Sequence, residues 1–304
     1  MKKFIYIFSL LPLSFNLWAG TTNMYQTQSI YGIDDRVDVY NSSIPKYREW
    51  AKSVAALIPD YWLTEVRDGS GDLKFDGMPS PLNLCSNQRF IGQIAISECS
   101  AFLVGEDLIL TAGHCVEMIS NSCEWYYWIF DFVINQDGSN PSRFSRQQIY
   151  RCKEVVADSM GPLDYMDYAL IRLDRKVEGR AALPLRKSGI IPDNATVVAV
   201  GTPSGLPTKI AEHGEIINNL NEIYFTTTLD TFTGNSGSPV INAESGEVEG
   251  MLVSGLFDYK YNYEKKCYET IEYQVPYCRG ETALRISAIV DGLARIGHRD
   301  LIFP

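Results

Sequence analysis

The stretch GNSGSP, residues 234–239, places two glycines around a single serine, Ser236. Glycine adopts backbone conformations that other residues avoid, so this pattern bends the chain sharply. One interpretation is an ordinary surface turn. The other is a turn that presents one hydroxyl group beside exposed backbone N–H groups. The second interpretation requires partner residues elsewhere in the chain, above all a base that can take the serine proton.

The bulk composition is that of a globular protein with an acidic balance. The 304 residues are 45% hydrophobic and 21% charged, with a formal net charge of −10. Nucleic acids and anionic membranes require a basic surface, so neither is an expected partner. The three histidines stand outside any CxxC or HExxH pattern, and we expect neither a metal site nor a cofactor.

The N-terminus has the organisation of a secretory signal peptide. Lys2 and Lys3 precede an apolar run at 4–13, and Ala19 is a small residue suited to cleavage. The alternative is an uncleaved membrane anchor, but the run is short for a bilayer span and contains a proline. We therefore expect residues 1–19 to be removed and the protein to be secreted or periplasmic, without membrane attachment.

All seven cysteines follow the signal peptide, and in an oxidising compartment they favour disulfides. The odd number leaves at least one free or intermolecular. Cys267 and Cys278 flank a polar, tyrosine-rich segment, which indicates one bridged pair. The remaining candidates outside the motifs below, Cys85, Cys123 and Cys152, supply one pair and one single cysteine in an order that the sequence leaves open.

From Phe90 onward, short apolar runs alternate with turns, as in SAFLVG, YALIRL and TVVAVG. Short strands at this spacing predict an all-β sandwich or barrel. Residues 44–59 fit a helix or a strand, 59–86 predict a loop or insertion, and 125–132 predict a buried strand rather than an aromatic ligand patch. A helical pattern appears at the end, in 283–299.

Two further motifs offer partners to the serine. LTAGHC places His114 just after an apolar strand, and a Cys99–Cys115 bridge would join the ends of a hairpin and fix the turn that carries this histidine. MDYALIRL places Asp167 at the start of another apolar strand. Asp164, three residues earlier, is the alternative acidic residue.

Together these motifs resemble the chymotrypsin/trypsin family of serine endopeptidases, in the order His, Asp, Ser over roughly residues 87–257. The resemblance implies an all-β fold of two packed six-stranded antiparallel β-barrels, a C-terminal α-helix, and a site in the cleft between the barrels. It implies that His114 is the base, Asp167 its orienting partner and Ser236 the nucleophile. The N–H groups of Gly234 and Ser236 would form the oxyanion hole.

The segment SIYGIDDR at 29–36, the stretch TFTGNSGSPV and Asn235 are similar to the bacterial glutamyl-endopeptidase branch of that family. This similarity implies a short propeptide at 20–28 and a protease domain at 29–304. The alternative is that only the signal peptide is removed. Asn235 is neutral, so it cannot form the ion pair with a new N-terminus that activates the trypsin branch.

Substrate preference has conflicting signals. Asp230 stands six residues before Ser236, where trypsin-like enzymes carry a pocket carboxylate that favours Lys or Arg. The alternative is that Asp230 fixes the backbone ahead of the glycine. In the strand that follows the serine loop, Leu252 or Val253 stands where glutamate-cleaving relatives have a histidine. The resemblance implies a pocket wall at Val253, Ser254 and Gly255.

The sequence therefore predicts a secreted serine endopeptidase that acts on proteins or peptides. The competing class is a catalytically silent homologue that binds rather than cleaves. A second enzymatic alternative is an esterase that acts on non-peptide substrates. The oligomeric state is left open.

Overall fold

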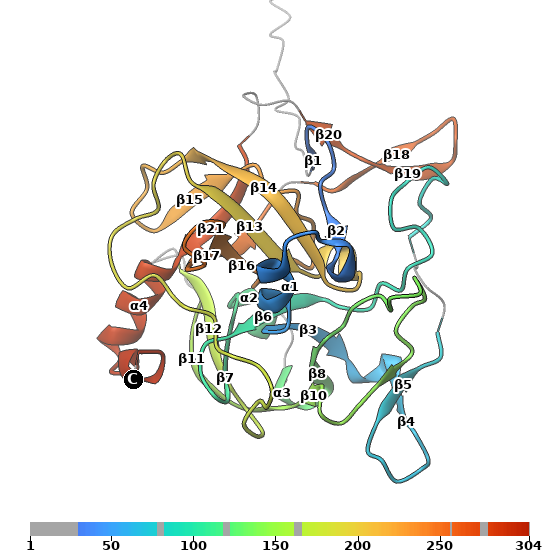
Figure 1. The fold of residues 1–304 in the computed structure, drawn as a ribbon, viewed down its shortest axis with the longest axis horizontal. Coiled ribbons are helices and arrows are strands. Elements are labelled where there is room, and N and C mark those ends of the chain that lie inside the picture. The colour runs from blue at the N-terminus through green and yellow to red at the C-terminus, as the bar shows by residue number, and fades with distance from the viewer. Residues whose placement is uncertain are drawn as a thin grey trace, which may run out of the picture.

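The chain folds into two β-sheet lobes, as Figure 1 shows. A computed structural model describes residues 30–77, 82–117, 122–160, 166–255, 257–273 and 279–303. The expected signal peptide and propeptide lie outside these ranges, as do Asp164 and Cys278.

The first lobe is a seven-stranded antiparallel sheet with the order β10-β8-β3-β6-β7-β12-β11. Its strands are β3 (Val54–Pro59), β6 (Cys99–Leu103), β7 (Leu108–Thr111), β8 (Tyr126–Phe130), β10 (Ile149–Tyr150), β11 (Cys152–Met160) and β12 (Asp167–Leu173). The apolar runs of the sequence become its buried strands, since every residue of β3, β6 and β7 is buried.

The second lobe is a closed six-stranded barrel. Its order is β13-β16-β17-β21-β15-β14, and β13 pairs again with β14 to close the ring. Its strands are β13 (Thr196–Gly201), β14 (Lys209–Asn218), β15 (Tyr224–Thr227), β16 (Pro239–Asn242), β17 (Val248–Ser254) and β21 (Glu281–Arg285), and β2 (Val37–Asp38) adds to the edge of β14. The predicted all-β fold with two barrel-like lobes is confirmed.

The first lobe differs in detail from the six-stranded closed barrel that we expected, because it is a half-barrel. Two strands, β4 (Leu63–Glu65) and β5 (Leu73–Phe75), form within 59–86, where a loop or insertion was predicted, and β9 (Arg143–Phe144) joins them in a separate sheet. Leu63, Leu73 and Phe75 alternate with exposed or half-buried residues and enter a second apolar cluster. Their burial explains why this insertion is a hairpin.

Two small sheets complete the structure. One pairs β1 (Ile30–Tyr31) with β20 (Glu272–Tyr273), and the other pairs β18 (Tyr259–Asn262) with β19 (Cys267–Thr270). The first of these places the beginning of the described chain beside a segment close to its end, as Figure 1 shows.

Helices are few and short. They are α1 (Pro45–Ala51), α2 (His114–Glu117), α3 (Ser122–Trp125) and α4 (Ile286–Arg295), with 3-10 turns η1 (Val39–Asn41), η2 (Asp60–Trp62), η3 (Pro203–Gly205) and η4 (Arg299–Leu301). The predicted C-terminal helix is α4. The ambiguous segment 44–59 holds both α1 and β3. Within the described ranges, no helix is long and apolar enough to cross a membrane.

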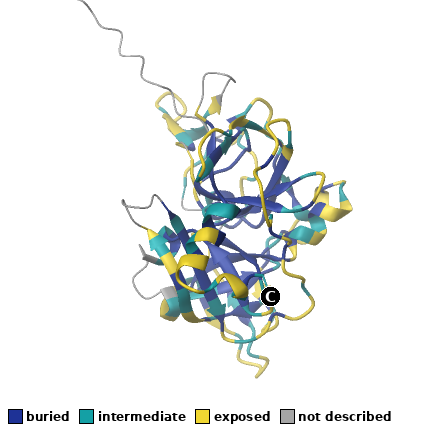
Figure 2. Cartoon of the chain, turned by 90° about the vertical axis from the view of Figure 1, so that its left-hand side faces the viewer, coloured by how far each residue is buried: buried dark blue, intermediate teal, exposed yellow. Residues whose placement is uncertain are grey.

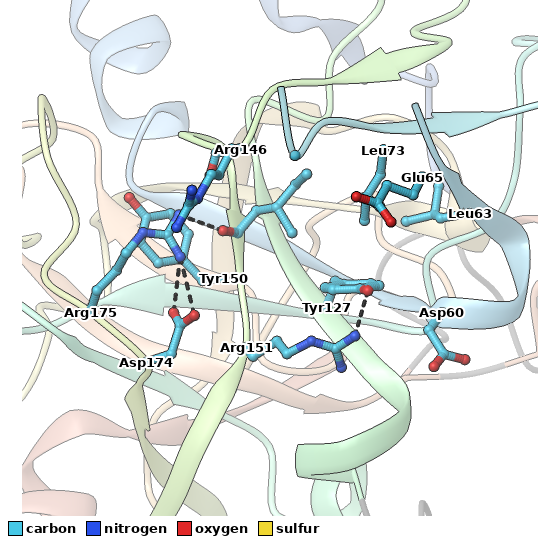
Figure 3. Close-up of a pocket in the computed structure, with 12 residues that line it drawn as sticks. Asp60, Leu63, Glu65, Leu73, Tyr127, Arg146, Tyr150, Arg151, Asp174 and Arg175 are labelled. Atoms are coloured by element: carbon cyan, nitrogen blue, oxygen red, sulfur yellow. Dashed lines mark hydrogen bonds and ion pairs between the residues drawn. The ribbon is translucent and has the colours of Figure 1, made fainter. Parts of the chain in front are cut away.

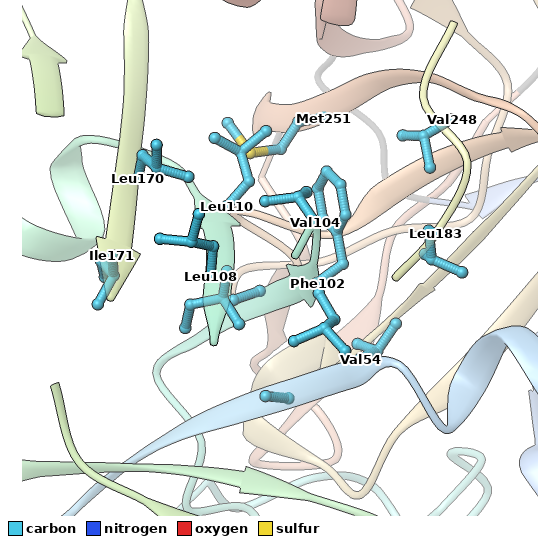
Figure 4. Close-up of a cluster of buried hydrophobic side chains, with 14 of the residues drawn as sticks. Val54, Phe102, Val104, Leu108, Leu110, Leu170, Ile171, Leu183, Val248 and Met251 are labelled. Atoms are coloured by element: carbon cyan, nitrogen blue, oxygen red, sulfur yellow. The ribbon is translucent and has the colours of Figure 1, made fainter. Parts of the chain in front are cut away.

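Buried residues fill the interior of both lobes, as Figure 2 shows, and one apolar cluster runs between them. In Figure 4, Val248 of β17 lies near Leu183, and both belong to the cluster that also contains Met251 of β17 and Phe102 of β6. The backbone reinforces this junction, because the Val248 N–H donates to the Pro184 carbonyl at 2.7 Å. The lobes therefore share one core.

Three disulfides connect the described cysteines. The structure joins Cys99 to Cys115, the pair that the hairpin argument names, and also joins Cys123 to Cys152. It joins Cys267 to Cys85, so the expected Cys267–Cys278 pair is wrong. The reason lies in the backbone, because the Cys85 N–H donates to the Tyr268 carbonyl at 2.9 Å and brings the two Cα atoms to 5.0 Å.

We expect the double substitution Cys85→Ser, Cys267→Ser to lower the free energy of unfolding by about 2–4 kcal/mol, because the bridge closes a loop of 182 residues in the unfolded chain. The matched variant Cys123→Ser, Cys152→Ser opens a separation of only 29 residues and should cost about 1–2 kcal/mol less. Urea unfolding of the two variants measures both losses. Equal losses would contradict the loop-length argument.

Candidate active site

His114 is the first residue of α2, separated by two residues from the end of β7, and one carboxylate contacts both its backbone and its ring. The backbone N–H of His114 donates to Asp167 Oδ1 at 2.9 Å, and its ring Nδ1 lies 2.8 Å from Asp167 Oδ2. The side chains of both residues are 21% exposed. Gly113 allows this approach, because a Cβ there would collide with the Ser159 carbonyl and crowd Asp167.

The clamp decides which ring nitrogen is available for chemistry. A carboxylate can only accept a hydrogen bond, so the neutral imidazole carries its proton on Nδ1. Nε2 is then the unprotonated nitrogen and can accept a proton from another group. Asp167 is the first residue of β12, which pairs with β7, and this pairing explains why the two motifs meet. The arrangement is that of an oriented base.

Ser236 lies in a loop of the second lobe that the first lobe holds in place. The Ser100 N–H donates to the Ser236 carbonyl at 2.8 Å, and Cys115 Sγ lies 3.9 Å from the same oxygen. Because Cys115 follows His114 directly, these contacts bring the serine loop to the histidine. Ser236 is half-buried, so its side chain retains access to solvent.

Along residues 234–237, backbone N–H groups that donate hydrogen bonds within the protein alternate with N–H groups that do not. Asn235 donates to the Phe232 carbonyl at 2.9 Å, and Gly237 donates to the Leu252 carbonyl at 2.7 Å. Within the described part of the chain, the N–H groups of Gly234 and Ser236 donate to no protein acceptor. The two glycines of the loop have positive φ angles, +98° at Gly234 and +86° at Gly237. The loop therefore leaves unused the two donors that an oxyanion would need.

Asp230 is 2% exposed and does not face an open pocket. Its Oδ1 accepts the Tyr31 N–H at 2.8 Å and its Oδ2 accepts the Asp35 N–H at 2.9 Å. Burial raises the pKa of Asp230 to about 6, although these two hydrogen bonds lower it. Asp230 thus anchors the backbone of residues 31–35, a structural role at a different place from the one that the sequence analysis considered.

A buried arginine of the same segment packs against Phe232, just before the serine loop. Arg36 is 3% exposed, pairs with Asp34 at 2.7 Å and lies over the ring of Phe232, 3.9 Å from its centroid. A buried guanidinium needs such a partner, because removing an unpaired charge from water is costly. Burial, followed by the charge of Asp230, raises the pKa of Asp35 to about 8.

The other expected pocket residues lie at the end of β17. Val253 is buried, whereas Ser254 and Gly255 are exposed. The Gly255 backbone covers the carboxylate of Glu281. This carboxylate accepts hydrogen bonds from the hydroxyl groups of Thr231, at 2.5 Å, and Tyr31, at 3.1 Å. The structure thus places a second buried carboxylate near this strand that the sequence analysis missed.

A cavity of about 620 Å³ lies elsewhere, on the first lobe, and Figure 3 shows it. Its lining includes Tyr127, Tyr150, Arg151 and Arg175 but none of the three motif residues. Two of its arginines already have partners, since Arg175 pairs with Asp174 at 3.1 Å and Arg151 donates to the Glu124 carbonyl at 2.9 Å. This cavity is therefore separate from the candidate active site.

One group of side chains in the described ranges has ligand atoms spaced as in a metal site, namely Cys99, His114 and Cys115. The two cysteines form a disulfide, so neither offers the thiolate that a metal would bind. The histidine is left with one carboxylate neighbour, which suits proton transfer rather than metal coordination.

A profile of the family described as "Trypsin-like peptidase domain" matches residues 99–251, which is half of the chain and contains His114, Asp167 and Ser236. The chain belongs to the trypsin-like peptidase family. Among curated proteins, no sequence matches it significantly. The motifs above are therefore those of a trypsin-like serine protease.

Solved protease structures resemble this peptidase at low identity. The VesB protease of Vibrio cholerae has 15% identity over 87% of this chain and 68% of its own, with a TM-score of 0.49. An inactive form of Rv3671c from M. tuberculosis has 13% identity over 84% and 91%, with a TM-score of 0.47. A serine endoprotease from Yersinia pestis has 18% identity over 83% and 65%, with a TM-score of 0.46.

We expect the anchor of the N-terminal segment to make stability depend on pH. The Asp35 carboxyl group stays protonated in the folded peptidase up to about pH 8, whereas in the unfolded chain it ionises near pH 4. The unfolded state therefore binds fewer protons in this window, and this group lowers stability as the pH rises from about 4 to 8.

The variant Asp35→Asn removes this titration, so its stability relative to the wild type should increase steadily between pH 5 and pH 8. Urea unfolding at several pH values measures the difference, with Ser236→Ala in the background to prevent self-digestion. Asp300→Asn, at an exposed position, is the control and should follow the wild type. Parallel curves for Asp35→Asn and wild type would refute the buried-pair argument.

Proposed function

We propose that the protein is an exported serine endopeptidase in which Ser236, His114 and Asp167 form the catalytic triad. The observation that carries the proposal is the double contact of Asp167 with His114, at 2.9 and 2.8 Å, beside the loop that presents Ser236. A serine hydroxyl is a weak nucleophile without a base, and an oriented neutral imidazole supplies that base.

The chemistry follows from these positions. His114 Nε2 takes the proton of the Ser236 hydroxyl as Oγ attacks the carbonyl carbon of the scissile peptide bond. The oxyanion that forms is stabilised by the N–H groups of Gly234 and Ser236. His114 then gives its proton to the leaving amine, and an acyl-enzyme remains. Water, activated by the same histidine, hydrolyses the acyl-enzyme and releases the serine.

Export is a part of this proposal that rests on the N-terminal sequence. Residues 1–19 would be a cleaved signal peptide and 20–28 a short propeptide, giving a mature domain that begins at Ser29. The three disulfides support an oxidising compartment, because such bonds are rare in the cytosol. N-terminal sequencing of the exported protein tests both cleavage points.

The test of this function distinguishes the endopeptidase from two alternatives. A silent homologue would bind peptides without cleaving them, and an esterase would act on non-peptide substrates. The silent homologue is less well supported, since the oriented base and the two unused N–H donors are the parts that hydrolysis requires. An esterase would use the same parts, so the choice between ester and peptide substrates is left to the test.

We expect Ser236→Ala to abolish labelling by a fluorophosphonate and hydrolysis of fluorescent casein, because the attacking oxygen is gone. Asp167→Asn should lower kcat about 10³- to 10⁴-fold, because the histidine would then lose its orienting acceptor. Asp158→Asn, on β11, is a control that should retain activity. Equal labelling of Ser236→Ala and wild type would refute the nucleophile assignment, and labelling without casein hydrolysis would favour the esterase.

Residue preference is proposed to depend on the wall formed by Val253, Ser254 and Gly255 rather than on Asp230. Both oxygens of Asp230 already accept backbone N–H groups, so an approaching Lys or Arg side chain would have to displace residues 31–35. The similarity to the glutamyl-endopeptidase branch is carried here by the segment that Asp230 anchors.

A cleavage profile on a peptide library tests the role of Asp230. We expect Asp230→Asn to lower cleavage of all peptides by a similar factor, because it loosens the segment against the serine loop, and to leave the residue preference unchanged. Asp300→Asn serves as the control. A selective loss of cleavage after Lys or Arg in Asp230→Asn would instead establish Asp230 as the pocket carboxylate.

A further inference from the structure

Three buried hydroxyl groups form a connected cluster at the junction of the two lobes. Ser97 Oγ and Ser100 Oγ each lie 3.0 Å from Thr202 Oγ1. Ser97 is 7% exposed, and Ser100 and Thr202 are fully buried. Ser97 and Ser100 belong to the first lobe, whereas Thr202 follows β13 of the second. Nothing in the triad chemistry accounts for hydroxyl groups at this position.

The cluster converges on the carbonyl group of Gly234. Ser100 Oγ donates to this oxygen at 2.9 Å, and Thr202 Oγ1 lies 3.0 Å from it. No backbone N–H in the described part of the chain donates to the Gly234 carbonyl. Buried carbonyl groups are nearly always hydrogen-bonded, so this one depends on the two hydroxyl groups.

The preceding peptide is held by the same region of the second lobe. The Ser204 N–H donates to the Thr233 carbonyl at 2.5 Å. Ser204 has φ of 55° and ψ of 24°, a left-handed conformation that is uncommon for a residue other than glycine. In a trans peptide the N–H points opposite to the carbonyl, so this bond turns the Gly234 N–H away from the turn at 202–205.

Ser100 also holds the other side of the loop. Its backbone N–H donates to the Ser236 carbonyl at 2.8 Å, while its side chain donates to Gly234 two residues earlier. Gly234 has φ of +98° and, lacking a Cβ, an unusually wide range of backbone conformations. Its orientation is therefore fixed by its hydrogen-bond partners rather than by its own sterics.

We propose that Ser100 and Thr202 are positioning residues for the oxyanion hole, whose hydroxyl groups hold the Gly234 carbonyl back so that the N–H groups of Gly234 and Ser236 face the reacting carbonyl. This inference rests on the proposed function. Without the two hydroxyl groups, the Gly234 carbonyl keeps no hydrogen-bond donor in the described part of the chain, and only the Asn235 N–H bond to the Phe232 carbonyl still holds the Gly234–Asn235 peptide. This peptide lies between the two peptides that carry the oxyanion donors, so its weaker attachment misaligns the donors in the transition state.

The test measures phosphonylation of Ser236 by a small alkyl fluorophosphonate. Ser236 Oγ bonds to phosphorus, the P–F bond breaks, fluoride leaves and His114 takes the serine proton, while the phosphoryl oxygen occupies the oxyanion hole. The maximal rate constant and the half-saturating concentration are determined separately. This readout is independent of which residue the enzyme prefers in its substrate.

We expect the maximal rate constant to fall about tenfold in Ser100→Ala, about tenfold in Thr202→Val and about a hundredfold in the double variant. Removing an oxyanion-hole donor outright lowers the rate about 10²- to 10³-fold, and misaligning a donor that is still present should lower it less. The half-saturating concentration should stay within about twofold of the wild type. Thr202→Ser keeps the hydroxyl group and should retain the rate. If Ser100→Ala does not fold, the comparison of the rate constants of Thr202→Val and Thr202→Ser tests the proposal.

Ser53→Ala is the matched control, because Ser53 Oγ is a buried hydroxyl that donates to the Ala181 carbonyl at 2.6 Å outside this cluster. It should lose thermal stability without losing rate. The proposal is overturned if a folded double variant reacts at the wild-type rate, or if Ser53→Ala slows the reaction equally. An unlabelled wild type, or equal labelling of Ser236→Ala, would instead overturn the proposed function.

Discussion

The hydrogen bond from the Ser100 N–H to the Ser236 carbonyl, at 2.8 Å, is the constraint on which the site depends. The base and its carboxylate belong to the first lobe, whereas the serine belongs to the second, so their geometry is set wherever the lobes are tied together. The bonds from the N–H groups of Ile96 and Ser97 to the Gly205 carbonyl, at 2.9 and 3.1 Å, tie the same place. The apolar cluster that runs through both lobes keeps this junction rigid. Preorganised donors stabilise charge without moving during the reaction, and a shared rigid junction supplies that condition.

A second constraint comes from charge buried beneath the serine loop. Arg36 is removed from water but is compensated by Asp34 and by the ring of Phe232. Asp230 is compensated by two backbone donors from residues 31–35. Since breaking either set would leave an uncompensated buried charge, the segment from Ile30 to Asp38 is an integral part of the second lobe. Its edge strand β2, which pairs with β14, adds to this attachment.

The sequence predicted what depends on local patterns. Short apolar runs predicted strands such as β6, β12 and β13, and the short motifs around His114, Asp167 and Ser236 identified residues that β7, β12 and the serine loop bring together. It failed where contacts are distant: Cys85 and Cys267 are 182 residues apart, and Ser100 and Thr202 are 102 apart. A buried hydroxyl bonded to a remote carbonyl leaves no periodicity in the sequence. The insertion at 59–86 was predicted as a loop because its glycines obscured the alternation of Leu63, Leu73 and Phe75, whose burial only the folded sheet provides.

The anchored segment also bears on the proposed removal of a propeptide. The Ile30 N–H donates to the Ile271 carbonyl at 3.3 Å, its side chain is 2% exposed, and the next residue supplies both an N–H to Asp230 and a hydroxyl to Glu281. Cleavage just before Ile30 would leave all of these contacts in place, whereas cleavage after Tyr31 would remove the buried isoleucine and leave Asp230 with one backbone donor fewer. The proposed processing before Ser29 therefore falls one residue ahead of the last position that preserves the support of the serine loop. A trypsin-type ion pair at Asn235 is unnecessary in such a design, because Asp230 already joins the N-terminal segment to the loop through backbone hydrogen bonds.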